Sequence, residues 1–186
     1  MELSDLAARI RGTQPVATPP AAIPRVEAVE EKLGFRLPAP LRFIYVGVAN
    51  GGFGPGGDVL GIAGGHAGEH GLTADELYLG YVTVEPDGPL PDPTDPTWRW
   101  PEKLMPFYDW GNGIYSCLDC SAEPAPVIVF DPNVQPWRDA FFFHRAALEE
   151  WLSAWLDGVD LWREMYPLGF TCALPSLPGF GQTSNA

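Results

Sequence analysis

Basic residues are scarce in this sequence of 186 residues. Lys and Arg number 11 against 24 Asp and Glu, so the formal net charge is −13 at pH 7. A surface of this sign repels phosphate backbones and anionic lipid, which argues against binding to nucleic acid or to a membrane surface. It favours a basic protein or a cation as the partner, and the alternative is that the charge only keeps the protein soluble.

Cysteines are few and long apolar runs are absent. The chain has three cysteines and no apolar run of about 18 residues, so we expect no membrane-spanning helix. Its start, MELSDLAARIRG, lacks the basic and apolar regions of a secretory signal. Three cysteines in such a chain indicate reduced thiols and a cytoplasmic location.

Motifs for common enzyme chemistry are missing or incomplete. No G-K-[ST] follows the glycines of GGFGPGG, and no G-x-S-x-G is present. Cys117 and Cys120 spell C-x-x-C but fall in a predicted strand, where residues three apart point to opposite faces. We therefore expect buried thiols there, with neither a redox nor a metal role.

A second motif leaves a metal-dependent hydrolase open as an alternative. His66, Glu69 and His70 spell H-x-x-E-H, which binds zinc only when a helix places both imidazoles on one face. Glycines inside and beside the motif favour a loop with solvated histidines. We predict no metal, no cofactor and no catalytic residue.

The chain is rich in the residues that build a core. Hydrophobic residues make up 46% of it, with seven Trp and ten Phe, which suits one globular domain. Apolar periodicity predicts helices at residues 3–10, 24–33, 40–48, 73–81 and 148–156, with a further helical turn at 161–165. Short aromatic and β-branched runs predict strands at residues 58–62, 104–110, 114–120, 126–131 and 140–144. The last four follow one another closely, and Asn-Gly at 112–113 favours a hairpin, so the sheet is predicted to be largely antiparallel.

The Pro/Ala stretch TQPVATPPAAIP has no packing pattern and suggests a domain boundary. We predict an N-terminal helix and Pro-rich arm at 1–23, an α+β domain at 24–166 and a C-terminal tail at 167–186.

The order of these segments resembles the SUKH superfamily, which includes bacterial immunity proteins and the fungal cell-wall-assembly regulator. Residues 31–52 carry the family's opening pattern, Leu33-Gly34, Leu37-Pro38, Leu41 and Asn50-Gly51. Residues 106–121 are similar to its strand–turn–strand segment ending in Leu118-Asp119. PVIVFDP at 126–132 and ALEEWLSAWLDG at 147–158 follow in the same order, so the resemblance covers about residues 24–158.

The resemblance implies an α+β fold in which helices pack on one face of a twisted, mostly antiparallel sheet. It implies no catalytic residue and no cofactor, and it implies protein binding as the function. Bacterial members typically bind and block a toxin, often a nuclease, so we expect a non-enzymatic immunity protein that neutralises a toxin by occlusion. A regulatory or scaffold interaction module is the first alternative, and the hydrolase above is the second.

Charge suggests where such a partner binds. Nuclease domains tend to be basic, and an acidic inhibitor is steered toward them. The acidic, proline-rich loop at 85–97 therefore suggests a contact surface, and the predicted partner-binding residues are Asp87, Asp92, Asp95, Glu69 and Asp75, with Trp98 and Trp100 as anchors. The alternative for this loop is a solvated linker. Trp110-Gly111 is either an aromatic binding platform or the buried anchor of a turn.

Overall fold

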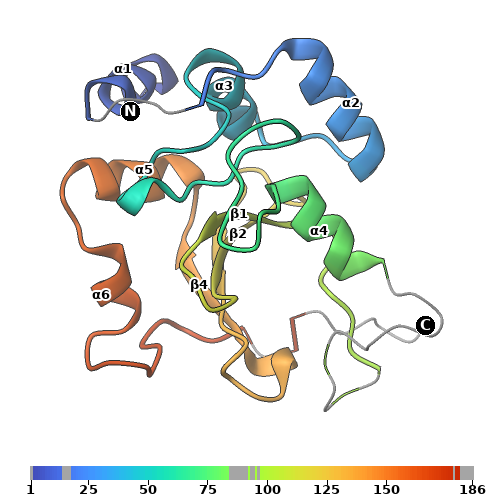
Figure 1. The fold of residues 1–186 in the computed structure, drawn as a ribbon. Helices are drawn as coiled ribbons and strands as arrows, with labels where there is room; N and C mark the ends of the chain where they lie inside the picture. Colours follow the sequence, from blue (N-terminus) through green and yellow to red (C-terminus); the bar gives the residue numbers. More distant parts are fainter. Residues whose placement is uncertain are drawn as a thin grey trace.

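The structure is a computed structural model that describes residues 2–13, 18–83, 92, 95, 97–177 and 179–180. Within these residues one antiparallel sheet has the strand order β1-β2-β3-β4 (Figure 1). The strands are β1 (Leu104–Asp109), β2 (Tyr115–Asp119), β3 (Val127–Phe130) and β4 (Phe141–Arg145). The four closely spaced runs of the sequence analysis are confirmed as its strands.

The predicted strand at 58–62 was wrong. Val59 makes only an isolated bridge to Tyr108, and a short 3-10 helix, η1 (Pro55–Gly57), precedes it. The side-chain amide of Asn50 instead holds this segment, because it donates to the Ile62 carbonyl at 3.0 Å and accepts from the Ile62 N–H at 2.9 Å. The Leu60 N–H donates to the Phe107 carbonyl at 2.8 Å and the Asp109 N–H donates to the Asp58 carbonyl at 3.2 Å, so the segment pairs with β1 only at its first residues, and Asn50 takes the place of a strand neighbour at Ile62.

The helices follow the predicted order. They are α1 (Leu3–Thr13), α2 (Ile23–Leu33), α3 (Ala39–Gly47), α4 (Ala74–Val82), α5 (Leu148–Leu156) and α6 (Leu161–Met165), with a further 3-10 turn, η2 (Trp137–Asp139), before β4. Helix α2 ends at Gly34, whose φ of 77° suits glycine. Helix α4 begins with the predicted capping box, in which the Thr73 N–H donates to Glu76 at 2.9 Å.

Aromatic side chains cover both faces of the sheet. On one face, Tyr81 of α4 stacks on Trp100 at 4.1 Å and packs edge-on against Tyr115 and Phe130. Val129 points the other way and is buried with Met165 at the end of α6. Figure 1 accordingly shows α4 and α6 on opposite sides of the strands. The α+β class and the antiparallel sheet are confirmed, and the second face is covered by α6, which follows the region of resemblance.

Both predicted terminal segments pack on the central domain. Leu6 and Ile10 of α1 belong to the main core, and Arg9 of α1 pairs with Asp157 after α5 at 2.6 Å. Near the other end, the Leu177 N–H donates to the Phe141 carbonyl at 2.9 Å, beside β4. The division at residues 23 and 166 stays a prediction. No described helix is both long and apolar enough to cross a bilayer.

Candidate functional site

A hollow of about 660 Å³ lies between the β1–β2 turn, the segment after β3 and helix α6. We call it the aromatic hollow. Its apolar lining consists of Trp110, Ile114, Trp162, Tyr166 and Phe170, and its polar lining of Asn112, Asp131 and Asn133. Its size falls within the range of about 300–1,000 Å³ that is typical of ligand sites.

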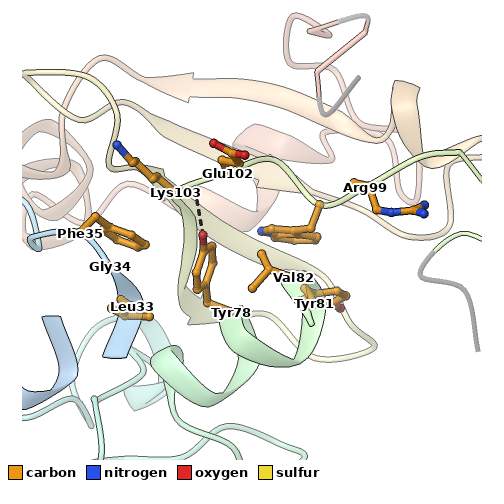
Figure 2. Close-up of a pocket in the computed structure, with 10 residues that line it drawn as sticks. Leu33, Gly34, Phe35, Tyr78, Tyr81, Val82, Arg99, Glu102 and Lys103 are labelled. Atoms are coloured by element: carbon orange, nitrogen blue, oxygen red, sulfur yellow. Dashed lines mark hydrogen bonds between the residues drawn. The ribbon is translucent and has the colours of Figure 1, made fainter. Parts of the chain in front are cut away.

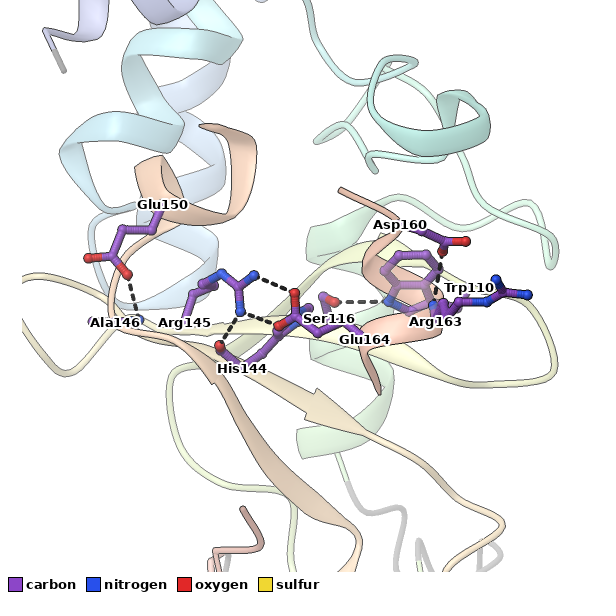
Figure 3. Close-up of polar contacts among 9 residues, drawn as sticks. All are labelled: Trp110, Ser116, His144, Arg145, Ala146, Glu150, Asp160, Arg163 and Glu164. Carbon is purple, nitrogen blue, oxygen red and sulfur yellow. Dashed lines mark hydrogen bonds and ion pairs between the residues drawn. The ribbon is translucent and has the colours of Figure 1, made fainter. Parts of the chain in front are cut away.

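The β1–β2 turn positions the first wall. The Trp110 N–H donates to the Ile114 carbonyl at 2.9 Å, and Asn112 takes a φ of 54°, which asparagine tolerates in a tight turn. The Trp110 indole N–H donates to the Ser116 hydroxyl at 2.9 Å (Figure 3). Trp110 is half-buried, so it anchors the turn and also presents part of its ring to the hollow.

Helix α6 supplies the opposite wall and is held by polar contacts to β4. Glu164 forms a two-point ion pair with Arg145, in which Arg145 Nη2 lies 2.6 Å from Glu164 Oε2 (Figure 3). Asp160 caps the helix by accepting from the Arg163 N–H at 2.9 Å. Because α6 is short, these contacts and the burial of Met165 fix where its aromatic side chains lie.

Three aromatic rings follow one another across the hollow. The ring centroids of Trp110 and Trp162 lie 5.7 Å apart, and those of Trp162 and Tyr166 lie 4.6 Å apart. Beyond them, Phe170 is 94% exposed and Leu168 is 96% exposed. Exposed apolar side chains next to a concave aromatic site favour a protein-interaction region.

A buried carboxylate lies at the polar side of the hollow. Asp131 is 2% exposed, and its Oδ1 accepts from the backbone and side-chain N–H groups of Asn133, both at 2.9 Å. Its Oδ2 accepts from the Tyr166 hydroxyl at 2.8 Å. Burial and this carboxylate raise the pKa of Tyr166, so the phenol stays a hydrogen-bond donor. Within the described part of the chain, no Lys or Arg forms an ion pair with Asp131.

A second hollow, of about 420 Å³, lies between the end of α2, helix α4 and the segment before β1. Figure 2 shows Phe35, Tyr78 and Tyr81 along it, with Glu102 and Lys103 above the Tyr78 hydroxyl. That hydroxyl accepts the Lys103 N–H at 3.1 Å. The hollow is smaller and is lined by charges of both signs, so it favours no one class of partner.

Two aspartates of the predicted partner surface are buried. Asp92 is fully buried and accepts the Trp137 N–H at 3.0 Å. Asp95 is 9% exposed, pairs with Arg138 and accepts the Thr97 N–H at 3.1 Å. Hydrogen bonds from Thr97 lower the pKa of the Asp95 carboxyl, and the nearby Arg138 adds to this effect. Both aspartates tie their loop to the 3-10 turn η2, so they are not surface groups here.

Three further predicted residues are internal as well. Trp98 is 2% exposed and stacks on Phe141 at 6.1 Å, and Trp100 is 3% exposed and donates its indole N–H to the Leu104 carbonyl at 2.7 Å. Asp75 is 1% exposed and accepts the Ala63 N–H at 3.0 Å. These three side chains expose almost no surface with which to contact a partner, and their contacts stabilise the fold.

Glu69 is the predicted residue that lies by the aromatic hollow. It is exposed, and its Oε2 accepts the N–H of Asn112, which lines the hollow, at 3.0 Å. Its own N–H donates to Asp109 at 2.9 Å. Its role in partner binding stays a prediction. Asp87 lies outside the described residues.

Neither of the two sequence motifs forms a site in the described residues. Cys117 is buried in β2, Cys120 follows the strand, and both are free thiols. Burial raises the pKa of Cys117 and raises the pKa of Cys120 to about 12, which opposes thiolate chemistry. His66 and His70 lie in a loop and not on a helix, and no group of three or more His, Cys, Asp or Glu among the described residues is placed to hold a metal ion.

Sequence reasoning missed Asp131, Tyr166 and Phe170. Asp131 comes directly after a buried strand, which is a weak signal, and Tyr166 and Phe170 follow the region of family resemblance. These three residues lie together at the hollow because α6 packs against the sheet.

The chain matches a known protein family. The model of the SMI1 / KNR4 family (SUKH-1) matches residues 20–154. No curated protein and no solved structure matches. The matched segment runs from the approach to α2 through most of α5 and includes the whole sheet. The chain therefore belongs to the SMI1 / KNR4 family (SUKH-1).

Proposed function

We propose that this chain is a cytoplasmic immunity protein that binds a bacterial toxin, and that it neutralises the toxin by covering its active or substrate-binding face. Membership of the SUKH-1 family supports a protein-binding role. The observation that carries the proposal is the aromatic hollow with its exposed apolar rim at Leu168 and Phe170.

The charge of the chain supports a basic partner. A net charge of −13 attracts the basic surface with which a nuclease binds phosphate, and it raises the rate of association. Occlusion requires no chemistry from this chain, so the mechanism depends on shape, burial and charge alone. A nuclease toxin is therefore the partner class that fits best.

Inhibition of the partner's activity tests this function. The chain is used to capture its partner from the source cell, and the partner is then purified and assayed alone, for example on DNA and RNA. Addition of this chain is expected to abolish the activity at one equivalent. A partner that binds at full occupancy and keeps its activity contradicts the immunity role and favours the regulatory or scaffold alternative.

The salt dependence of partner binding separates the contribution of charge to the affinity from that of the exposed apolar residues. If charge dominates, raising the salt concentration weakens the complex strongly, because exposed charges are screened. If the apolar rim dominates, the complex persists at high salt. Retention of binding by a Leu168→Ser, Phe170→Ser double variant would show that the rim is not part of the interface.

A further inference from the structure

We propose that the aromatic hollow receives a cationic side chain of the partner, an arginine, between its tryptophan rings and Asp131. This inference rests on the proposed function, because it names what the partner places in that site. It goes further in assigning a binding role to Asp131, Trp110 and Trp162.

The first argument is the buried carboxylate. Buried carboxylates are usually paired with a cation, because desolvation of the charge is costly. Asp131 is 2% exposed and accepts three hydrogen bonds, all from uncharged donors. A carboxylate has about four acceptor positions, so one remains, on the Oδ2 atom that Tyr166 also contacts. An incoming cation can supply both the missing hydrogen bond and the missing charge.

The second argument is the aromatic wall. A cation within about 6 Å of a Trp or Tyr ring is attracted by the negative face of the ring, and the attraction is strongest for Trp. Trp110 and Trp162 are half-buried, line the hollow and lie 5.7 Å apart between ring centroids. A partner side chain entering the hollow therefore meets indole rings on the way to Asp131.

The third argument is the sign of the surrounding charge. The described lining contains no basic residue. Arg163 of α6 is exposed and is not part of the lining, and in Figure 3 its guanidinium points away from Glu164 and Ser116. Glu69 adds an exposed carboxylate at Asn112 on the rim. The site is thus negative and aromatic, and no described basic side chain of the chain itself fills it.

Arginine fits these features better than lysine. Its planar guanidinium stacks on aromatic faces, is weakly hydrated and carries five N–H donors in a fixed arrangement. It can stack on an indole ring and still direct one N–H to Asp131. Lysine carries a compact, strongly hydrated charge that gains less from stacking.

The test uses a short capped peptide, acetyl-Gly-Arg-Gly-amide, and the same peptide with citrulline, which keeps the shape of arginine and lacks its charge. Binding is followed by the indole N–H signals of the seven tryptophans in a nitrogen–proton NMR spectrum. Phe variants at Trp110 and Trp162 assign their two signals. The arginine peptide is expected to shift these two signals and to bind about tenfold more tightly than the citrulline peptide, which corresponds to roughly 1.4 kcal/mol.

Two variants separate the site from the overall charge. Asp131→Asn is expected to lower the affinity for arginine to that for citrulline. Glu102→Gln removes the same charge from the exposed rim of the second hollow and is expected to leave the affinity unchanged. If Asp131→Asn alters the fold, seen in the backbone amide spectrum, Trp162→Leu replaces it, because Trp162 is half-buried and the variant keeps an apolar side chain.

Equal affinity for the two peptides overturns the inference. So do equal losses in Asp131→Asn and Glu102→Gln, shifts confined to other tryptophans, and no shift at the highest soluble peptide concentration. The proposed function fails separately: if the peptide binds at the hollow but the partner's activity is not inhibited, the immunity role is wrong and the arginine site stands. If the partner is inhibited equally by the wild-type chain and by Asp131→Asn, the immunity role stands and the arginine site is wrong.

Discussion

His144 belongs to β4, its imidazole faces Glu164 of α6, and its side chain has no exposed surface. Neither ring nitrogen has a hydrogen-bond partner among the described residues, and the Glu164 carboxylate lies 3.5 Å from Nε2. Burial, with a smaller contribution from the Arg145 charge, lowers the pKa of His144 from its ordinary value of 6.5 to about 4, although Glu164 opposes both effects. The folded protein therefore holds a neutral imidazole over a pH range in which the unfolded chain binds a proton.

The sign of the effect on stability follows from that difference. Well above pH 6.5 both states are neutral at this position and His144 adds no pH dependence. As the pH falls from 6.5 to about 4, the unfolded chain gains a proton that the folded protein does not, so the free energy of unfolding decreases. The loss approaches roughly 3 kcal/mol near pH 4.

His144→Leu removes this proton uptake and keeps a buried side chain of similar size. We expect the free energy of unfolding of the variant, relative to that of the wild type, to be higher by roughly 2–3 kcal/mol near pH 4.5 than near pH 7.5. Urea denaturation followed by circular dichroism measures both proteins across this range. His70→Gln serves as the control, because His70 is exposed and its variant should follow the wild-type curve. Parallel curves for His144→Leu and the wild type would refute the reasoning.

Three further predictions concern the core, the acidic loop and the thiols. Trp151 has no exposed surface and packs edge-on against Phe107 at 5.2 Å. Trp151→Ala should therefore lower the free energy of unfolding, measured by urea denaturation, by about 3–5 kcal/mol. A loss under about 1 kcal/mol would contradict this packing. Asp92→Lys places a cation in the interior and should destabilise the fold by about 3 kcal/mol or more in calorimetry. Glu69→Lys should change stability by under about 1 kcal/mol and weaken partner binding. If Asp92→Lys instead weakened binding and left stability unchanged, the acidic loop would again be the candidate interface. Alkylation at pH 8 should leave Cys117 unmodified in the folded protein and modify it fully in urea, and mass spectrometry that finds rapid labelling in the folded state would disprove its burial.

Local signals in the sequence predicted most of the elements. The Thr73–Glu76 capping box begins α4 and Gly34 ends α2, because each depends only on neighbouring residues. The Asn-Gly turn joins β1 to β2 for the same reason. The strand prediction at 58–62 was wrong because Asn50, which lies outside that segment, makes the backbone hydrogen bonds of Ile62.

The candidate site was much harder to predict than the fold. Acidic residues at 92 and 95 look like a solvated surface in the sequence, but their partners, the Trp137 N–H and Arg138, lie more than 40 residues away. Conversely, the hollow combines a β-turn, a residue after β3 and a helix after the family region. Composition contains no information on such long-range pairings, so only the packing of α6 on the sheet reveals the site.

The central claim is that the partner binds at the aromatic hollow. Amide hydrogen exchange of the chain, free and saturated with its captured partner, measures this directly. The account predicts slower exchange in the complex at residues 110–114 and 161–170 and no change at 33–35 and 99–103 around the second hollow. Protection confined to the second hollow, or to any face that excludes α6 and the β1–β2 turn, would contradict it.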